Sequence, residues 1–167
     1  MSLIRGKVIK LVKYSSNYIT ELRSWFKNQE ELAKWSGPNF RFPHTLETFT
    51  EDLNCKELAS YCLINDKHEF IAFGQFYLRL GHCHLGRLVV NPQHRGQGII
   101  NQLIQQLAIK GTKTLGNTSL SLFVLTTNPS AINAYKRLGF NEFIYPESLP
   151  LENCIYMTLE QPHWLND

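Results

Sequence analysis

The first third of the chain alternates hydrophobic and polar positions in two different ways. Residues 8–14 alternate apolar with mostly basic side chains, the period-two pattern of a half-exposed strand. Residues 18–28 repeat apolar positions at helical spacing, and residues 30–35 and 48–54 show the same pattern over shorter lengths. Gly and Pro mark residues 36–43 as a loop. This region is predicted to be one strand followed by short helices.

The middle of the chain changes to a strand pattern. Residues 61–65, 70–80 and 84–90 are predicted to be strands, with Asp66-Lys67 and Gly81-His82 as the hairpin turns between them. Residues 99–109 then form the clearest helix pattern, because apolar pairs recur every four residues and alternate with polar pairs. The apolar run 120–126 predicts a strand that is covered on both sides.

The last part of the chain predicts a capped helix and two strands. Asn128 can cap a helix, Pro129 is tolerated at its first position, and Gly139 suits the left-handed conformation at its end. Residues 140–145 and 154–159 supply the final strands. The whole order predicts an α/β (α+β) fold, a sheet with helices on both faces.

Length and composition limit the classes of protein. A chain of 167 residues with 43% hydrophobic content predicts a single domain over residues 1–167. Apolar runs of membrane-spanning length and signal-peptide features are missing from the sequence, which predicts a cytoplasmic protein with no membrane partner. The four cysteines are scattered singly, so neither a metal site nor a disulfide framework is expected.

The charge distribution is more informative than the net charge of +3. Residues 70–141 contain seven basic residues and no Asp or Glu, whereas the rest of the chain has ten basic and fourteen acidic residues. A positive field over one segment attracts an anionic ligand, although a solvated basic face gives the same pattern. The basic residues are widely spaced and match no nucleic-acid-binding signature, so no nucleic acid is expected as a partner.

A glycine turn within this basic segment joins a strand to the clearest helix. The turn Arg95-Gly96-Gln97-Gly98 runs directly into the helix that begins at Ile99, where free backbone N–H groups and the helix dipole favour an anion such as pyrophosphate. A Walker loop would require Gly-Lys-Ser or Gly-Lys-Thr, which is missing here. A dinucleotide fingerprint would require a third glycine where Asn101 stands.

Two motifs together resemble the GCN5-related N-acetyltransferase (GNAT) family. The first spans residues 88–99 and is similar to the strand, loop and Arg-x-x-Gly-x-Gly/Ala signature of that family. The second spans residues 128–140 and is similar to its Asn-x-x-Ala-x-x-x-Tyr-x-x-x-Gly-Phe segment. The resemblance implies a mixed, mostly antiparallel sheet with a splayed parallel strand pair. It covers residues 60–160, the expected cofactor-binding core, and extends to residues 1–58, the expected acceptor side, only by topology.

The resemblance also implies acetyl-coenzyme A as the co-substrate, without a metal. Backbone groups of one strand would hold the pantetheine arm, and amides of the turn and first helical residues would hold the pyrophosphate. Ile100 departs from the family pattern, which has Gly or Ala there, and this leaves the cofactor affinity open. The implied cofactor-binding residues are Leu88, Val89, Val90, Arg95, Gly96, Gln97, Gly98, Ile99, Ile100, Asn128, Ala131 and Tyr135.

Catalysis of acetyl transfer requires a proton for the departing thiolate and a neutral amine. The resemblance places Tyr135 near the cofactor sulfur as the general acid, although a core tyrosine would fit the same helix face. His84 is the candidate base by comparison with small-amine acetyltransferases. A water relay to Glu69 or Glu142, or no base at all, stays open. Phe123 stands where enzymes that acetylate protein N-termini have Glu, which disfavours that activity.

Two functions remain at this point. The favoured one is an acetyl-CoA-dependent N-acetyltransferase that acts on an amine of a small molecule or peptide. The alternative is a catalytically silent acyl-CoA-binding sensor or regulatory module. The acceptor side is expected to include Trp35, Phe40, Phe42 and Tyr77. The oligomeric state stays open, with a homodimer as one option.

Overall fold

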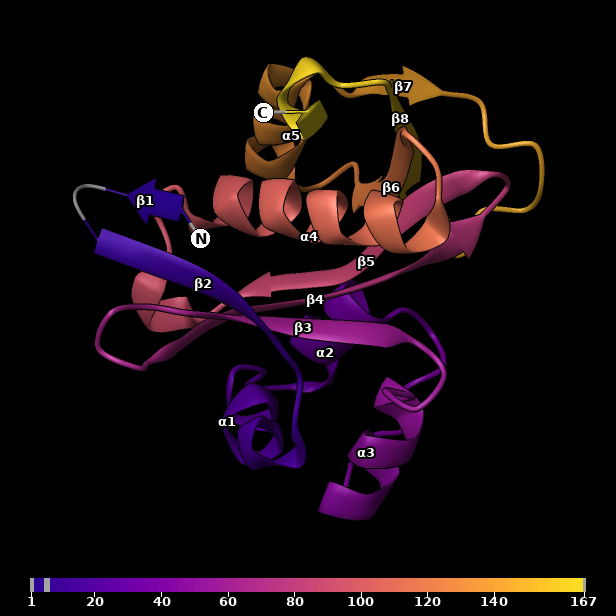
Figure 1. The fold of residues 1–167 in the computed structure, drawn as a ribbon. Coiled ribbons are helices and arrows are strands. Elements are labelled where there is room, and N and C mark those ends of the chain that lie inside the picture. The colour runs from indigo at the N-terminus through magenta and orange to yellow at the C-terminus, as the bar shows by residue number, and fades with distance from the viewer. Residues whose placement is uncertain (1, 5–6, 167) are drawn as a thin grey trace.

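The computed structural model describes residues 2–4 and 7–166 and arranges them around one eight-stranded sheet (Figure 1). The strand order is β1-β2-β3-β4-β5-β6-β8-β7, and every neighbouring pair is antiparallel except β5 and β6, which are parallel. The strands are β1 (Ser2–Ile4), β2 (Lys7–Lys13), β3 (Ala59–Ile64), β4 (Phe70–Arg79), β5 (His82–Val90), β6 (Ser119–Leu125), β7 (Asn141–Phe143) and β8 (Cys154–Glu160).

Helices cover both faces of this sheet. In Figure 1, α4 crosses one face along β4 and β5, while α1–α3 lie on the other side of the same strands. The α-helices are α1 (Ile19–Ser24), α2 (Gln29–Ser36), α3 (Leu46–Leu53), α4 (Ile99–Leu115) and α5 (Pro129–Leu138), and the 3₁₀ helices are η1 (Ser16–Tyr18), η2 (Pro92–His94) and η3 (His163–Asn166). The predicted mixed sheet between two helical layers is confirmed.

The alternation of side chains along β4 sends two hydrophobic cores to opposite faces of the sheet. Phe73 packs with buried residues of α1–α3, whereas Phe76 packs with buried residues of α4 and α5. Full burial of a large apolar side chain of this kind contributes about 1.5–3 kcal/mol. Gly111 lets α4 approach closely, because a Cβ added there would lie 2.5 Å from Cys83 Sγ. The site-forming strands are therefore fixed from both faces.

The parallel pair opens partway along its length. Strands β5 and β6 pair only at Cys83, His84 and Leu85 of β5, although β5 continues to Val90. Strand β6 stays paired with β8 as far as Leu125, so the two strands separate after their third pair. This separation is the predicted splay, and it leaves a gap between β5 and β6.

Most predicted boundaries shift by one or two residues, and the strand expected over residues 140–145 ends at Phe143, but two helices and one strand differ more. The helix expected over residues 18–28 ends at Ser24, because Asn28 accepts a hydrogen bond from Glu31 N (2.9 Å) and caps α2 instead. The helix expected over residues 99–109 continues to Leu115, because Gly111 packs against β5 where the apolar repeat is interrupted. Strand β1 was not predicted, and it pairs antiparallel with β2, with Ile4 opposite Lys7.

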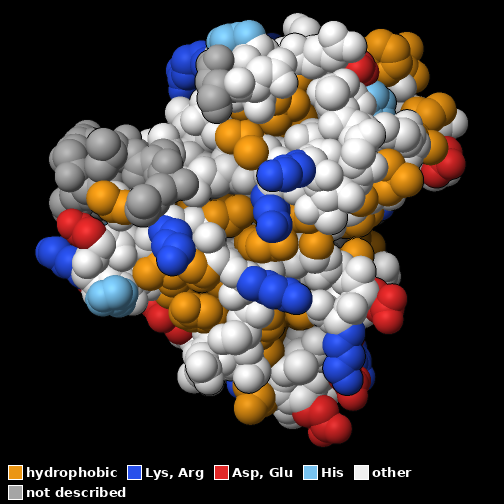
Figure 2. Space-filling model, viewed as in Figure 1, with side chains coloured by type: hydrophobic (Ala, Val, Ile, Leu, Met, Phe, Trp, Pro, Cys, Tyr) orange, Lys and Arg blue, Asp and Glu red, His pale blue; other side chains and the backbone are white. Residues whose placement is uncertain are grey.

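Figure 2 shows the face that α4 crosses: Lys and Arg side chains lie apart across its middle, and acidic side chains lie toward its rim. Within the described residues, no helix is long and apolar enough to cross a membrane. No group of three or more His, Cys, Asp or Glu side chains in that part of the chain could hold a metal ion. The four cysteines are free thiols.

Candidate active site

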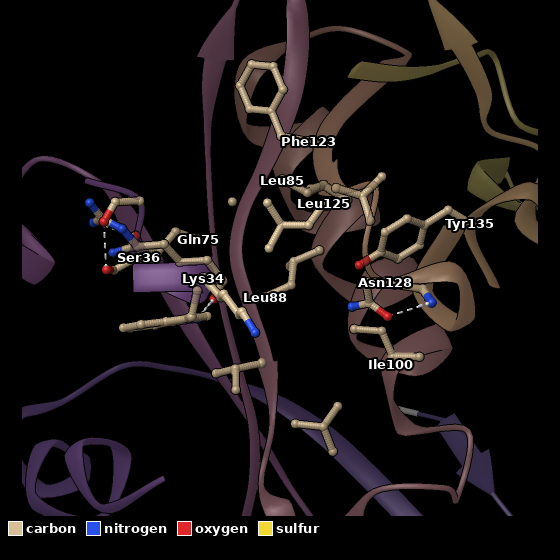
Figure 3. Close-up of a pocket in the computed structure, with 18 of the residues that line it drawn as sticks. Lys34, Ser36, Gln75, Leu85, Leu88, Ile100, Phe123, Leu125, Asn128 and Tyr135 are labelled. Carbon is tan, nitrogen blue, oxygen red and sulfur yellow. Dashed lines mark hydrogen bonds between the residues drawn. The ribbon is translucent and has the colours of Figure 1, made fainter. Parts of the chain in front are cut away.

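A cleft of about 1080 Å³ follows the gap between β5 and β6. Residues from the glycine turn and α5 line one side of it, and residues from α2 and β4 line the other (Figure 3). The lining includes His84 and the predicted cofactor-binding residues Leu88, Val89, Val90, Arg95, Gly96, Gly98, Ile99, Ile100, Asn128, Ala131 and Tyr135. Gln97, also predicted, is exposed and does not line the cleft. The structure thus brings the two sequence motifs to one cavity.

The glycine turn leaves the beginning of α4 open to the cleft. Gly96 and Gly98 have φ angles of 75° and 74°, a left-handed backbone that other residues rarely adopt. Gly98 caps the helix without a side-chain hydrogen bond, and the first turn contains no acidic residue. Backbone N–H groups and the positive end of the 17-residue helix therefore face the cleft. This arrangement fits a pyrophosphate.

Two side chains of the first turn of α4 modify this end of the cleft. Ile100 lines the cleft and also packs against both hydrophobic clusters beneath α4, so its bulk is anchored in place. Asn101 Oδ1 is buried and has no hydrogen-bond partner among the described residues. Other atoms of Asn101 line the cleft beside this buried acceptor.

Tyr135 reaches the gap from α5. Its side chain is 7% exposed, and burial raises the pKa of its phenol to about 12, so it is protonated at neutral pH. None of the hydrogen bonds between described residues involves its hydroxyl, which points across the gap toward Leu88 (Figure 3). Asn128 caps the same helix by accepting from Ala131 N at 3.2 Å. The Tyr135 hydroxyl is therefore available to donate a proton within the gap.

A β-bulge in β5 forms the opposite wall. Gln75 pairs with Gly86 and Phe73 with Val89, so β5 has an extra residue between these pairs, and Arg87 adopts a φ of 49°. The Arg87 carbonyl accepts a hydrogen bond from Trp35 Nε1 of α2 at 2.7 Å. Because a trans peptide points its N–H opposite to its C=O, the next amide faces away from Trp35. Helix α2 thus fixes the orientation of this bulge.

His84 lies at the closed end of the gap, where β5 and β6 are still paired. It is 2% exposed, and its Nδ1 lies 2.8 Å from Ser121 Oγ. Burial, assisted by the positive charge of Arg79, lowers its pKa to about 3. The imidazole is therefore neutral at pH 7, but it is a weak proton acceptor, which disfavours the role of general base.

The acceptor side contains three polar residues that sequence reasoning did not select, Gln75, Arg79 and Arg87. Gln75 and Arg79 alternate along β4 with the predicted Tyr77, and all of them line the cleft together with Arg87. The sequence contains this pattern of polar residues at every second position, but it could not show that these side chains lie on the face of the sheet that borders the cleft. Gln75 Nε2 donates to Leu53 O (2.8 Å) and Ser60 Oγ (2.9 Å), which anchors this row beneath α3.

The predicted acceptor-side aromatics separate into two groups. Trp35 and Tyr77 line the cleft, whereas Phe40 and Phe42 do not. Phe40 packs against the ring of Trp35 (5.6 Å between centroids) and fills the core, and Phe42 is 43% exposed. The two carboxylates considered for a water relay, Glu69 and Glu142, also lie outside the lining.

Solved structures of acetyltransferases have the same fold. A spermidine N-acetyltransferase from Vibrio cholerae, in complex with CoA and spermine, matches with a TM-score of 0.74 and 16% identity over 95% of this chain and 98% of that one. The ribosomal-protein-S18-alanine N-acetyltransferase from Escherichia coli matches with a TM-score of 0.65 and 22% identity over 92% and 94%.

A sequence model of the acetyltransferase (GNAT) family matches residues 29–140, which is more than half of the chain. The matched region includes α2, the bulged β5, the glycine turn and α5, which are the elements that form the cleft. The chain therefore belongs to the GNAT family and is an acetyl-CoA-dependent N-acetyltransferase.

Proposed function

We propose that the acetyl group passes to a primary amine in the gap between β5 and β6, with Tyr135 as the general acid. The observation that carries this proposal is the Tyr135 hydroxyl, which is protonated, unbonded within the described residues and directed into the gap. A core tyrosine would be expected to use its hydroxyl in a protein hydrogen bond. The amine would enter from the side of α2 and β4.

The residues along the gap fit acetyl-CoA. Leu88, Val89 and Val90 would hold the pantetheine arm through their backbone, because β5 has no β6 partner beyond Leu85. The amides of the turn and the first residues of α4, with Arg95 beside them, would hold the pyrophosphate. Asn128 and Ala131 would contact the cofactor at the start of α5. Residues 60–160 contain all of these cofactor-side residues, and residues 1–58 contribute part of the acceptor side through α2.

The reaction forms one bond and breaks one bond. Acetyl-CoA supplies the activated acetyl group, whose carbonyl carbon bonds to the amine nitrogen as the carbon–sulfur bond breaks and sulfur takes a proton from Tyr135. The bulge held by Trp35 positions backbone N–H groups of β5 along the gap, where they can stabilise the carbonyl oxygen as it gains charge. The amine must lose two protons overall when the acceptor arrives as an ammonium ion.

The amine protons leave most simply to water. His84 is too weak a base for this task, and Glu69 and Glu142 do not line the cleft. The cleft itself is open to solvent at residues such as Lys34 and Asn39, which are exposed. We infer that the enzyme takes the neutral fraction of the acceptor amine and uses no protein base.

The test of the proposal is Tyr135→Phe, assayed by CoA release from acetyl-CoA with a panel of amino acids, amino sugars, polyamines and peptides. Loss of the general acid should lower kcat by roughly 10²- to 10³-fold. The affinity for CoA, measured by calorimetry, should change little. Tyr61→Phe is the matched control, because Tyr61 lies on β3 outside the cleft lining and should keep full activity.

The same experiment separates the enzyme from an acyl-CoA sensor. The sensor is favoured by Ile100, whose side chain lines the phosphate end of the cleft where the family pattern has Gly or Ala. A sensor would bind acetyl-CoA without releasing CoA in the presence of any amine. Tyr135→Phe would then change neither CoA release nor CoA affinity. That combination would falsify the proposed roles of these residues.

A further inference from the structure

The acceptor side of the cleft contains an arginine that is connected to the opening of the gap. The Arg79 guanidinium donates to Tyr77 Oη and to Tyr145 Oη, each at 3.0 Å. The Tyr77 ring lies over Gly86, because a Cβ added at Gly86 would lie 3.4 Å from Tyr77 Cε1. Gly86 directly follows Leu85, the last residue of β5 that pairs with β6. Arg79 is therefore linked through the Tyr77 ring to Gly86, where β5 separates from β6.

A second arginine lies on the same side of the cleft, beside Gln75 of β4. Arg87 is half-buried, donates to Gln75 Oε1 (3.1 Å) and lies over the Phe40 ring (4.9 Å to the centroid). Arg87 interacts electrostatically with the Asp52 carboxylate, but Asp52 already forms a salt bridge with Arg41 at 2.8 Å. Neither Arg79 nor Arg87 has a carboxylate within 4.0 Å among residues 2–4 and 7–166.

The charged residues of the cleft are strongly unbalanced. The lining contains one carboxylate, Glu31, which is exposed and already accepts a hydrogen bond from Lys27 N (2.8 Å). The cations that line it are Lys34, Arg79, Arg87, Arg95 and Arg137. Arg95 and Arg137 lie at the cofactor end, and Lys34 is paired with Glu30 at 2.9 Å. Arg79 and Arg87 thus leave positive charge at the acceptor end.

We propose that the acceptor is a primary amine that also carries an anionic group, a carboxylate or a phosphate, and that Arg79 binds this group. Arg87 adds positive charge on the same side of the cleft. This inference rests on the proposed function, since it names the class of amine that enters the same site.

The chemistry of Arg79 suits this role. A guanidinium has five N–H groups, and the two tyrosine hydroxyls use two of them, so three remain for a ligand. The planar fork of arginine matches the two oxygens of a carboxylate or phosphate. The rings of Tyr77 (5.3 Å) and Phe123 (5.1 Å) lie against the guanidinium and hold its plane in position. A polycation would instead be repelled by both arginines.

Matched pairs of amines test the inference through binding, independently of turnover. Calorimetry on the CoA-loaded protein would compare phenylalanine with phenylalaninamide, O-phosphoethanolamine with ethanolamine, and glucosamine 6-phosphate with glucosamine; spermidine serves as the polycation. In at least one pair, the member with the anionic group should bind roughly 10- to 100-fold more tightly than the member without it. This is the range expected for hydrogen bonds to a charged group. The pair that responds distinguishes a carboxylate from a phosphate.

Variants identify the arginine that is responsible. Arg79→Gln should remove the preference and raise the KM of the anionic acceptor roughly 10- to 100-fold, with little change in the KM of acetyl-CoA. Arg79→Lys should restore part of the preference, because it keeps the charge but loses the fork. Arg23→Gln is the matched control: Arg23 is also half-buried without a carboxylate partner in the described residues, but it bonds His44 (3.2 Å) outside the cleft.

Each outcome decides one question. Equal binding of acid and neutral members, the tightest binding by spermidine, or no binding by any pair overturns the inference. A preference that survives in Arg79→Gln overturns it as well. Anion-selective binding without CoA release keeps the anion site but contradicts the proposed transfer, whereas turnover of neutral amines alone keeps the transfer and removes the anion site.

Discussion

The two sides of the cleft are built in different ways. The cofactor side consists of two continuous segments, the end of β5 with the glycine turn and α4, and the start of α5, and much of its chemistry comes from backbone groups. The acceptor side is assembled from α2, β4, the bulge of β5 and Phe123 of β6, and its chemistry comes from side chains. Backbone amides at a helix start bind many phosphates alike, whereas side chains select one acceptor. Variants on the two sides should therefore affect different kinetic constants.

The largest effect on the affinity for CoA is expected at the glycine turn. Gly98→Val places a β-branched residue at a φ of 74°, which costs about 1–2 kcal/mol of stability and crowds the amides that face the cleft. The Kd of CoA, measured by calorimetry, should rise by about tenfold or more. Gly116→Val is the control, because Gly116 ends the same helix at a φ of 71° with similar open space. If both variants bind CoA like the parent protein, the turn does not hold the cofactor.

A pH-dependent effect is expected from His84 on the acceptor side. Its folded-state pKa is about 3, below the ordinary value of 6.5. Its contribution to stability is therefore fully present above pH 6.5, where the imidazole is neutral in both the folded and the unfolded chain. As the pH falls from 6.5 toward 3, His84 becomes protonated in the unfolded chain but stays neutral in the folded chain. The free energy of unfolding therefore declines by up to about 1.4 kcal/mol per pH unit. In His84→Gln, urea titrations at several pH values should show a shallower decline.

His82→Gln is the control for this experiment. His82 also bonds a serine, with Nδ1 2.9 Å from Ser119 Oγ, but it is only half-buried. Its replacement should leave the acid-induced decline in place. The same decline in His84→Gln as in the parent protein would contradict a buried neutral imidazole, and the role of His84 as a base would then be favoured again.

A smaller effect is expected from the indole that holds the bulge. Trp35→Phe removes the hydrogen bond to the Arg87 carbonyl, a loss of about 1 kcal/mol, and loosens the wall that orients the acetyl group. We expect kcat to fall about fivefold while the Kd of CoA is unchanged. Trp164→Phe removes a comparable bond, from Trp164 Nε1 to Leu138 O (3.3 Å), outside the cleft. An equal loss of kcat in both variants would assign the effect to stability alone.

The smallest effect is expected at Ile100. Ile100→Ala opens the phosphate end of the cleft, so the Kd of CoA should decrease about threefold. The variant also loses packing against the clusters beneath α4, which lowers its stability. Ile132→Ala loses similar packing on α5 without lining the cleft, so it should be destabilised with no change in CoA affinity. A weaker CoA affinity in Ile100→Ala would show that the side chain assists binding.

The cofactor side could be predicted from the sequence because its signals are local. Gly98 requires a left-handed backbone, Asn128 caps the helix that follows it, and the helix pattern after Gly98 is strongly amphipathic. These features depend on neighbours within a few residues, and the sequence displays such neighbours directly. The extent of α4 was underestimated because its last turns depend on Gly111 packing against Cys83, a contact between separate segments.

The acceptor side was decided by the tertiary structure. The sequence by itself determined the strands, the turn and the capped helices, since these follow from local periodicity and backbone preference. It could not place Arg79 beside Tyr145, 66 residues away, or join Trp35 to the Arg87 carbonyl. It also could not show that His84 is buried enough for its pKa to fall to about 3. Burial and long-range contact set these properties, and both exist only after the sheet has formed.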